Sequence, residues 1–164
     1  MTTDEHWMTL ALQEAAMAAE KGEVPVGAVV LSDGELISQA HNLRETDQDP
    51  LAHAELIALK GAADRLGSWR LVGCTLFVTL EPCAMCAGAL VNSRIERVVF
   101  AASDPKAGYC GSLGNIVQDE RLNHRVEVCR GVLQKKSTAM LKSFFAALRQ
   151  SGSPASLVTS ERLI

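Results

Sequence analysis

The sequence predicts an α/β fold: a three-layer α/β/α sandwich around a five-stranded mixed sheet. After an opening helix and a pair of strand-like segments, helical and strand-like segments alternate to the end of the chain. Such alternation is typical of helices packed on both faces of a sheet. The 164 residues are 48% hydrophobic and 21% charged, which are ordinary values for one globular domain. No repeat or linker divides the chain, so we expect one domain over residues 1–150 and a polar, mobile tail over 151–164.

The first part of the chain predicts a helix followed by a β-hairpin. Alanine-rich apolar positions at helical spacing predict a helix over 5–21, and Gly22 ends it. The continuous apolar run 26–31 is typical of a buried strand. Residues 32–34 form a turn, and a second strand over 35–40 pairs antiparallel with the first.

The middle of the chain predicts two helix–strand pairs. Residues 41–50 are polar, and Asp49-Pro50 stops any extension, so we expect a loop there. Apolar residues at helical spacing predict a helix over 51–66, and a buried strand follows over 74–80. A short helix over 84–92 and another buried strand over 97–102 repeat this order.

The last part predicts one more strand and a long helix. Residues 103–118 are rich in Gly and Ser, which predicts a loop with a short helix. A strand is expected over 125–129 and a helix over 131–150. Right-handed crossovers would bring the starts of the two middle helices to the carboxyl ends of neighbouring strands, a usual place for an active site.

Composition and charge restrict the classes of protein. No apolar run approaches the roughly 20 residues of a membrane span, and the acidic N-terminus does not resemble a signal peptide. Five cysteines, without the spacing of a disulfide scaffold, indicate reduced thiols in the cytoplasm. The net charge is −3, but residues 1–50 carry −8 and residues 51–164 carry +5. The second part could form a phosphate-binding basic face or an ordinary solvated surface.

Two short motifs have the spacing of a metal site. Cys83 and Cys86 follow Pro82, which suits the first turn of the expected helix. Positions i and i+3 share one helix face, and a helix N-terminus favours thiolates. Upstream, His53 and Glu55 form an H-x-E motif. H-x-E followed by P-C-x-x-C resembles the known signature of zinc-dependent nucleobase deaminases.

The pattern predicts a catalytic zinc site. His53, Cys83 and Cys86 would supply three ligands and leave a fourth position for water, whereas four protein ligands would mark a structural site. Zinc makes bound water a nucleophile near neutral pH, and Glu55 is suited to transfer its protons. Residues i and i+2 of a helix point about 200° apart, so Glu55 is not expected to bind the metal beside His53.

Each motif taken alone is compatible with a different role. C-x-x-C often marks half of a structural zinc site or a redox pair, and H-x-E occurs by chance. The two together, each at the start of an expected helix, favour the catalytic site. In a structural site the possible fourth ligands are His6, His41, His124 and Cys110. Of these, His41 and Cys110 are the main competitors.

From about Trp7 to Arg149 the chain resembles the bacterial tRNA-specific adenosine deaminases of the cytidine deaminase-like superfamily. Beside the two motifs, the resemblance is carried by Glu23-Val24-Pro25-Val26-Gly27-Ala28-Val29, Asn42, Leu76 to Ala89, Ser93-Arg94-Ile95, Val98-Val99-Phe100, Asp104-Pro105-Lys106-Ala107-Gly108, Gly111-Ser112-Leu113, Asn123-His124-Arg125-Val126 and Ser143-Phe144-Phe145. It implies a cytoplasmic homodimer with one zinc ion per subunit. The implied reaction is hydrolytic deamination of adenosine to inosine at wobble position 34 of a tRNA anticodon stem-loop, usually of an arginine tRNA.

The resemblance also implies roles for single residues. His53, Cys83 and Cys86 correspond to the zinc ligands and Glu55 to the proton shuttle. Asn42 corresponds to the side chain that hydrogen-bonds the flipped base. The implied walls of the base pocket are Pro25, Val26 and Ala54.

Further implied contacts lie later in the chain. Asp104 and Lys106 resemble residues that meet the nucleotide backbone and its ribose. Phe145 resembles an aromatic residue near the anticodon loop, whereas Phe144 is expected in the core. Tyr109-Cys110 stand where the family commonly has small residues, so this loop departs from the family pattern.

Two other functions fit the same motifs. A free-base or nucleoside deaminase acting on guanine, cytosine or cytidine would use the same zinc chemistry. A non-catalytic zinc-binding module would close the metal site with a fourth protein ligand, and Glu55 would then be incidental. Measurement of ammonia release from a panel of free bases and nucleosides distinguishes the first function from tRNA deamination. The number of protein ligands on the metal distinguishes the second.

Overall fold

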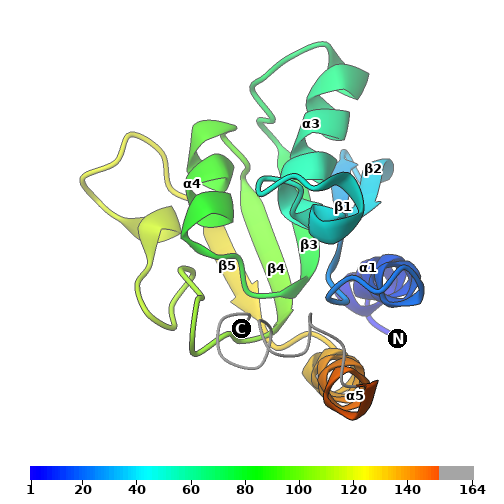
Figure 1. Cartoon of the computed structure of the whole chain (residues 1–164). Coiled ribbons are helices and arrows are strands. Elements are labelled where there is room, and N and C mark those ends of the chain that lie inside the picture. Colours follow the sequence, from blue (N-terminus) through cyan, green and yellow to red (C-terminus); the bar gives the residue numbers. More distant parts are fainter. Residues whose placement is uncertain (152–164) are drawn as a thin grey trace.

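A five-stranded sheet with helices on both faces forms the body of the computed structural model, which describes residues 1–151 (Figure 1). The strands are β1 (Gly27–Ser32), β2 (Glu35–His41), β3 (Cys74–Leu80), β4 (Arg97–Ala102) and β5 (Glu127–Arg130). The helices are α1 (Thr3–Glu20), α2 (Arg44–Asp47), α3 (Ala54–Leu66), α4 (Ala84–Asn92) and α5 (Gln134–Ser151), with a 3-10 turn η1 at Ile116–Gln118.

The strand order is β2-β1-β3-β4-β5, and the sheet is mixed, as predicted. β1 is antiparallel to both β2 and β3, whereas β3, β4 and β5 are parallel. Since β2 and β3 are both antiparallel to β1, they run in the same direction and end at the same edge. We call this edge of the sheet the carboxyl edge and the opposite one the amino edge.

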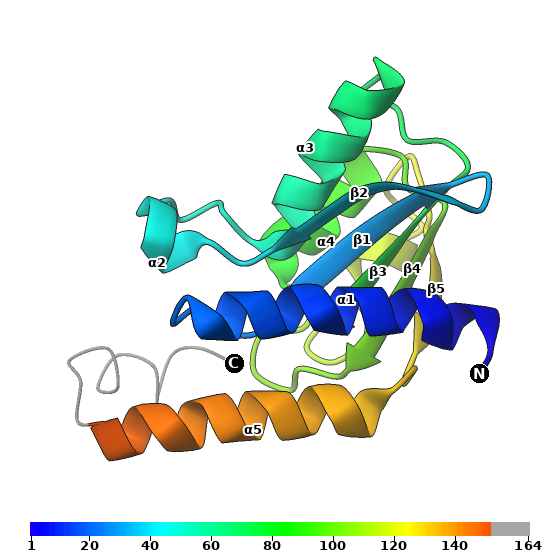
Figure 2. The same cartoon turned by 90° about the vertical axis from the view of Figure 1, so that its right-hand side faces the viewer.

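Two apolar layers hold the helices on the sheet. α1 and α5 lie side by side on one face, and α3 and α4 cover the other (Figure 2). Strand side chains alternate between the faces, so Val29, Phe77 and Val99 belong to the cluster that includes α1 residues. Leu76 and Val98 belong to the cluster on the α3 and α4 side. The predicted three-layer arrangement is confirmed, and coverage of both faces explains the continuous apolar runs of the middle strands.

Sequence spacing located the central elements and missed some boundaries. The predicted ranges of β3, α4 and β4 agree with the structure to the residue. α3 begins at Ala54 because His53 is an extended N-cap residue. α5 begins at Gln134 because Gly131 and Leu133 have φ angles of 88° and 56°, outside the right-handed helical region. Within the expected 41–50 loop, α2 adds one turn that is too short to show a period.

Of the two phenylalanines near the end of α5, the one expected in the core, Phe144, is the less buried. Phe145 is buried, whereas Phe144 is half-buried with its ring centroid 5.5 Å from that of Phe145. Ser137, Leu141 and Phe145 form the buried face of the helix at spacing i, i+4. Phe145 continues this buried face, so it packs inward and Phe144 does not.

The C-terminal tail was predicted from residue 151 onward. Ser151 is instead the last residue of α5, and residues 152–164 lie outside the described part of the chain. Among residues 1–151, no helix has both the length and the apolar character to cross a membrane.

Candidate metal centre and substrate cavity

The sheet topology brings the two predicted motifs together. β2 and β3 end at the carboxyl edge, and α3 and α4 start just beyond it. His53 is the N-cap residue of α3, Cys83 is the N-cap residue of α4, and Cys86 lies in the first turn of α4. Residues 30 or more positions apart in sequence therefore converge on one point.

The distances among these three side chains fit a tetrahedral zinc ion. His53 Nδ1 lies 3.7 Å from Cys83 Sγ and 3.5 Å from Cys86 Sγ. Zinc bonds of about 2.3 Å to sulfur and about 2.0 Å to nitrogen place these atoms about 3.5 Å apart in a tetrahedral site. One imidazole and two thiols are also a donor set that zinc prefers.

The cluster has three protein ligands. Within residues 1–151, no fourth His, Cys, Asp or Glu joins His53, Cys83 and Cys86. His41 is engaged elsewhere, since its Nδ1 lies 2.6 Å from Glu14 Oε2. Cys110 is buried in the core cluster on the α3 and α4 side. Neither predicted competitor closes the site, so the geometry is that of an open, catalytic type of centre.

Two details differ from the sequence-based expectation. Pro82 precedes the N-cap residue Cys83 and so lies outside the first turn of α4. The Pro82 carbonyl accepts a hydrogen bond from the Tyr109 N–H. His53 has an extended backbone with φ −76° and ψ 149°. The helical-wheel argument about His53 and Glu55 therefore does not apply, because only Glu55 lies within the helix.

The local environment makes Cys83 the more acidic of the two thiols. The hydrogen bond with the Cys86 thiol lowers the pKa of Cys83 to about 4, with help from His53 and the Cys86 N–H. The same thiol–thiolate hydrogen bond and burial raise the pKa of Cys86. Hydrogen bonding to Cys83 raises the pKa of His53. Zinc takes the place of protons at such ligands.

Glu55 is a buried carboxyl group beside the cluster. Only 4% of its surface is exposed, and burial raises its pKa to about 7. A carboxyl group with a pKa near neutrality can both accept and return a proton at physiological pH. It has this position because α3 begins directly after His53.

A cavity of about 270 Å³ opens onto the metal cluster at the carboxyl edge. It is lined by Val24, Val26, Asn42, Arg44, His53, Ala54, Glu55, Leu80, Glu81, Cys83, Asp104 and Ala107. The lining combines an apolar slot with a few polar groups, the usual character of a small-molecule site. The structure thus brings the metal cluster, Glu55, Asn42, Val26, Ala54 and Asp104 together in one place.

Three of the predicted substrate-binding residues do not line this cavity. Pro25 is buried at the centre of a three-residue turn, in which the Val26 N–H bonds to the Val24 carbonyl at 2.8 Å. Val24 and Val26 therefore face the cavity instead of Pro25. Lys106 is exposed beside Asp104, and Phe145 is buried in α5.

Asn42 is fixed at the wall of the cavity by the backbone on both sides. Its Oδ1 accepts a 3.1 Å hydrogen bond from the Arg44 N–H, and its Nδ2 donates to the Val24 carbonyl at 3.3 Å. An amide has two N–H donors and two acceptor lone pairs. One of each remains for a ligand.

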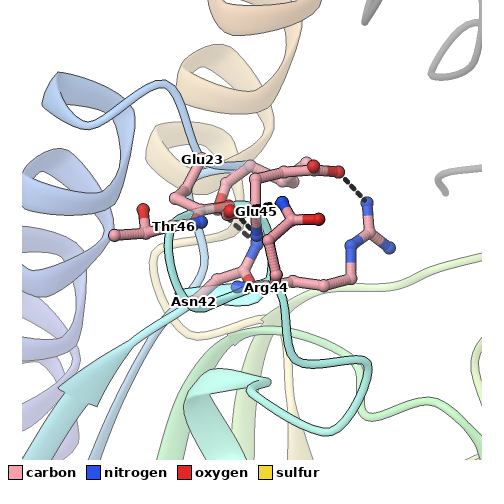
Figure 3. Close-up of polar contacts among 7 residues, drawn as sticks. Glu23, Asn42, Arg44, Glu45 and Thr46 are labelled. Atoms are coloured by element: carbon pink, nitrogen blue, oxygen red, sulfur yellow. Dashed lines mark hydrogen bonds and ion pairs between the residues drawn. The ribbon is translucent and has the colours of Figure 1, made fainter.

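Glu23 holds the start of α2 through hydrogen bonds to its backbone (Figure 3). Its carboxylate, 1% exposed, accepts hydrogen bonds from the N–H groups of Glu45 at 3.0 Å and Thr46 at 2.7 Å. These bonds place Arg44, the first residue of α2, in the cavity lining. Sequence reasoning missed both residues; an isolated acid before the apolar V-P-V run was the only available signal for Glu23.

Two further carboxylates shape the loop after β4. Asp104 Oδ1 accepts hydrogen bonds from the N–H groups of Lys106 and Ala107 at 3.0 and 3.2 Å, and burial raises its pKa. Glu81, 3% exposed, accepts hydrogen bonds from Ser112 and also lines the cavity. Sequence reasoning gave Glu81 no role, although an acid between a buried strand and Pro82 was a usable signal.

Comparison with known proteins assigns the family. Residues 2–149 match the MafB19-like deaminase family. A tRNA-specific adenosine deaminase of Bacillus subtilis is 56% identical over 150 residues, which are 92% of this chain and 93% of that protein. The chain belongs to the family of tRNA-specific adenosine deaminases.

Solved structures of this family and of a related one share the fold. One from a study of A-to-I editing by tRNA:A34 deaminases at the wobble position of transfer RNA is 40% identical, with a TM-score of 0.80 over 83% of this chain and 99% of that chain. A guanine deaminase from Nitrosomonas europaea is 25% identical, with a TM-score of 0.75 over 85% of this chain and 83% of that chain. The predicted cytidine deaminase-like α/β/α fold is confirmed.

Proposed function

We propose that the protein deaminates adenosine to inosine by hydrolysis at wobble position 34 of a tRNA anticodon. The observation that carries this proposal is the open three-ligand cluster with Glu55 beside it, in a cavity that also presents Asn42. Membership of the tRNA-specific adenosine deaminase family supports the choice of substrate.

Zinc held by His53, Cys83 and Cys86 would act as a Lewis acid that makes water a nucleophile near neutral pH. Glu55 takes a proton from the attacking water and delivers it to N1 of the adenine ring as oxygen bonds to C6. Glu55 then passes the second proton to the exocyclic nitrogen, which leaves as ammonia. Adenosine and water thus give inosine and ammonia, and the carboxyl group ends in its starting state.

The cavity recognises one extruded purine. Val24, Val26 and Ala54 offer an apolar slot for the ring, and the free donor and acceptor of Asn42 face its polar edge. Pro25 supports the two valines from behind. Asp104 and Lys106 flank the cavity and meet the ribose and backbone of the nucleotide, while Arg44 supplies positive charge to a phosphate.

The assembly, the location and the substrate tRNA are inferred from membership of the family. The protein acts as a cytoplasmic homodimer with one zinc ion per subunit, and an arginine tRNA is its substrate. Phe145 is buried and is next in sequence to the half-buried Phe144. We assign Phe145 the role of supporting the end of α5 near the anticodon loop.

A guanine deaminase activity is the second candidate, because a guanine deaminase with 25% identity shares the fold.

One experiment tests both candidates. Zinc-loaded protein is incubated with an anticodon stem-loop that carries adenosine 34, with the same stem-loop carrying cytidine 34, and with free guanine, cytosine and cytidine. We expect inosine from the first RNA alone. Ammonia release from guanine without inosine formation in RNA would favour the second candidate instead.

A further inference from the structure

A second hollow, of about 480 Å³, lies at the amino edge of the sheet. Three loops form it, and each one precedes a parallel strand: Arg70 lies before β3, Arg94 before β4, and Arg125 before β5. The metal cluster lies at the other edge, one length of β3 away. Seven strand residues span roughly 20 Å, so this hollow is a site separate from the cavity.

The hollow concentrates positive charge on an acidic protein. The whole chain has a net charge of −3, yet three arginines line this one surface, and Glu96 is the only carboxylate among its lining residues. His124 lies beside them, with its Nε2 2.6 Å from the Ile95 carbonyl oxygen. Among residues 1–151, none of the three arginines forms an ion pair. Guanidinium groups that lack protein carboxylates and converge in one hollow are suited to external phosphates.

Two of the guanidinium groups are held in place beside an exposed aromatic ring. The Arg70 Cζ atom lies 4.3 Å from the centroid of the Trp69 ring, and Arg94 Cζ lies 5.7 Å from it. Trp69 remains 54% exposed. Arg94 Nη1 donates to the carbonyls of Val91 at 2.9 Å and Asn92 at 3.2 Å, which leaves its Nε and Nη2 available.

The backbone of Arg94 points to a use for its side chain. Arg94 follows the last turn of α4 with φ +63°, a left-handed conformation that normally favours glycine at this position. An arginine here carries a backbone cost that glycine would avoid. Substitution by glycine therefore removes the guanidinium group and relaxes the chain at the same time.

We propose that this hollow, formed by Arg70, Arg94, Arg125 and His124 with Trp69 beside it, binds the sugar–phosphate backbone of the tRNA outside the nucleotide that enters the cavity. A basic surface combined with an exposed aromatic face matches nucleic acid, which offers both phosphates and bases that stack. The inference rests on the proposed function for the identity of the RNA. It adds a second RNA contact at the edge of the sheet opposite the chemistry.

The test measures equilibrium binding of labelled tRNA to zinc-loaded protein over a range of salt concentrations. Arg70→Gln/Arg125→Gln is expected to raise Kd about tenfold and to lower the salt slope by about one to two, since two phosphate contacts are lost. Lys60→Gln/Lys135→Gln removes the same charge at exposed lysines that line neither site, and it should change Kd far less. Arg94→Gly should also weaken binding while the Tm stays the same or rises.

The possible results separate this inference from the proposed function. Unchanged Kd and salt slope in the arginine variants would overturn the second RNA contact, as would equal losses in the lysine control. A change in sedimentation of Arg70→Gln/Arg125→Gln with unchanged RNA affinity would also overturn it, because the hollow would then join two copies of the chain. Inosine formation by the wild type is scored independently, so the proposed function can fail while the binding result stands.

Discussion

The Ser112 hydroxyl donates a 2.7 Å hydrogen bond to the buried carboxylate of Glu81. Glu81 lies in the connection from β3 to the cysteine helix α4, and Ser112 lies in the loop after β4, which also carries Asp104. A second hydrogen bond, from the Ser112 N–H to Glu81 at 3.3 Å, reinforces the link. The segment that leads into Cys83 and the loop that carries Asp104 are thus connected through one carboxylate.

Gly108 is required for this connection. A Cβ atom at Gly108 would overlap Glu81 Oε2 and lie 2.6 Å from the Asp104 carbonyl oxygen. We therefore expect Gly108→Ala to lower the free energy of unfolding by about 2 kcal/mol, as overpacking does, and to lower kcat/KM by displacing Asp104. Urea unfolding and the inosine assay measure the two effects.

Gly88→Ala is the matched control for Gly108→Ala. Gly88 lies within α4, and nothing lies within 4 Å of the position of its added Cβ. Alanine should be neutral or stabilise the helix by up to about 1 kcal/mol. A Gly108→Ala protein with wild-type stability and full activity would show that Glu81 does not set the position of the loop.

Glu55→Gln tests the proton shuttle. Glutamine keeps the size of the buried side chain but cannot accept a proton, so we expect kcat to fall by about 10²- to 10⁴-fold. The zinc content should stay at one per chain, because Glu55 is not a member of the ligand cluster. Single-turnover assays and metal analysis check both statements, with the exposed Glu20→Gln as a control that should behave as wild type.

The sequence predicted the fold well because its signals were local and strong. Continuous apolar runs marked β3 and β4, which are buried on both faces, and the two helix starts positioned His53 and Cys83. The boundaries that were wrong depend on single backbone angles, such as the positive φ at Leu133. Helical periodicity carries no information about such angles.

The site was predicted less completely than the fold. The grouping of His53, Cys83 and Cys86 with Glu55 at one place was predicted because these residues form a motif with fixed spacing. Glu23, Arg44 and Glu81 were missed because their places depend on hydrogen bonds to distant backbone groups. Val24 was missed as a lining residue because sequence spacing does not show the three-residue turn at Pro25, beside which Val24 and Val26 line the cavity.

Removal of the metal should destabilise the protein. If zinc is present at about 1,000 times its Kd, it stabilises the folded state by about 4 kcal/mol, which corresponds to a Tm change of roughly 10 °C for a chain of this size. A strong chelator should therefore lower the Tm by that amount and abolish inosine formation. Thermal melts with and without chelator provide the measurement.

Cysteine variants show whether the chelator effect comes from this cluster. Cys86→Ser should melt at the same temperature with and without chelator, because a ligand is lost. Cys74→Ser changes a buried cysteine outside the cluster and should keep the full chelator response. A wild-type Tm that does not respond to chelator would contradict a bound, stabilising zinc ion.

Asp4 should make stability depend on pH through its partner Arg97. The two side chains form paired hydrogen bonds of 3.0 and 2.8 Å, and Arg97 lowers the pKa of Asp4 below its ordinary value of 3.8. A lowered carboxyl pKa stabilises the folded state above pH 3.8, and this contribution disappears as the pH falls through the folded-state pKa. Because both side chains are about a quarter exposed, solvent screening limits the effect at pH 7 to about 1 kcal/mol.

Asp4→Asn should therefore lower the free energy of unfolding by about that amount at pH 7 and by progressively less below pH 4. Asp64→Asn, which breaks the exposed Lys60 pair, should cost less than about 0.5 kcal/mol at any pH. Equal losses for the two variants at pH 7 would show that the link between α1 and β4 adds nothing beyond an ordinary surface pair.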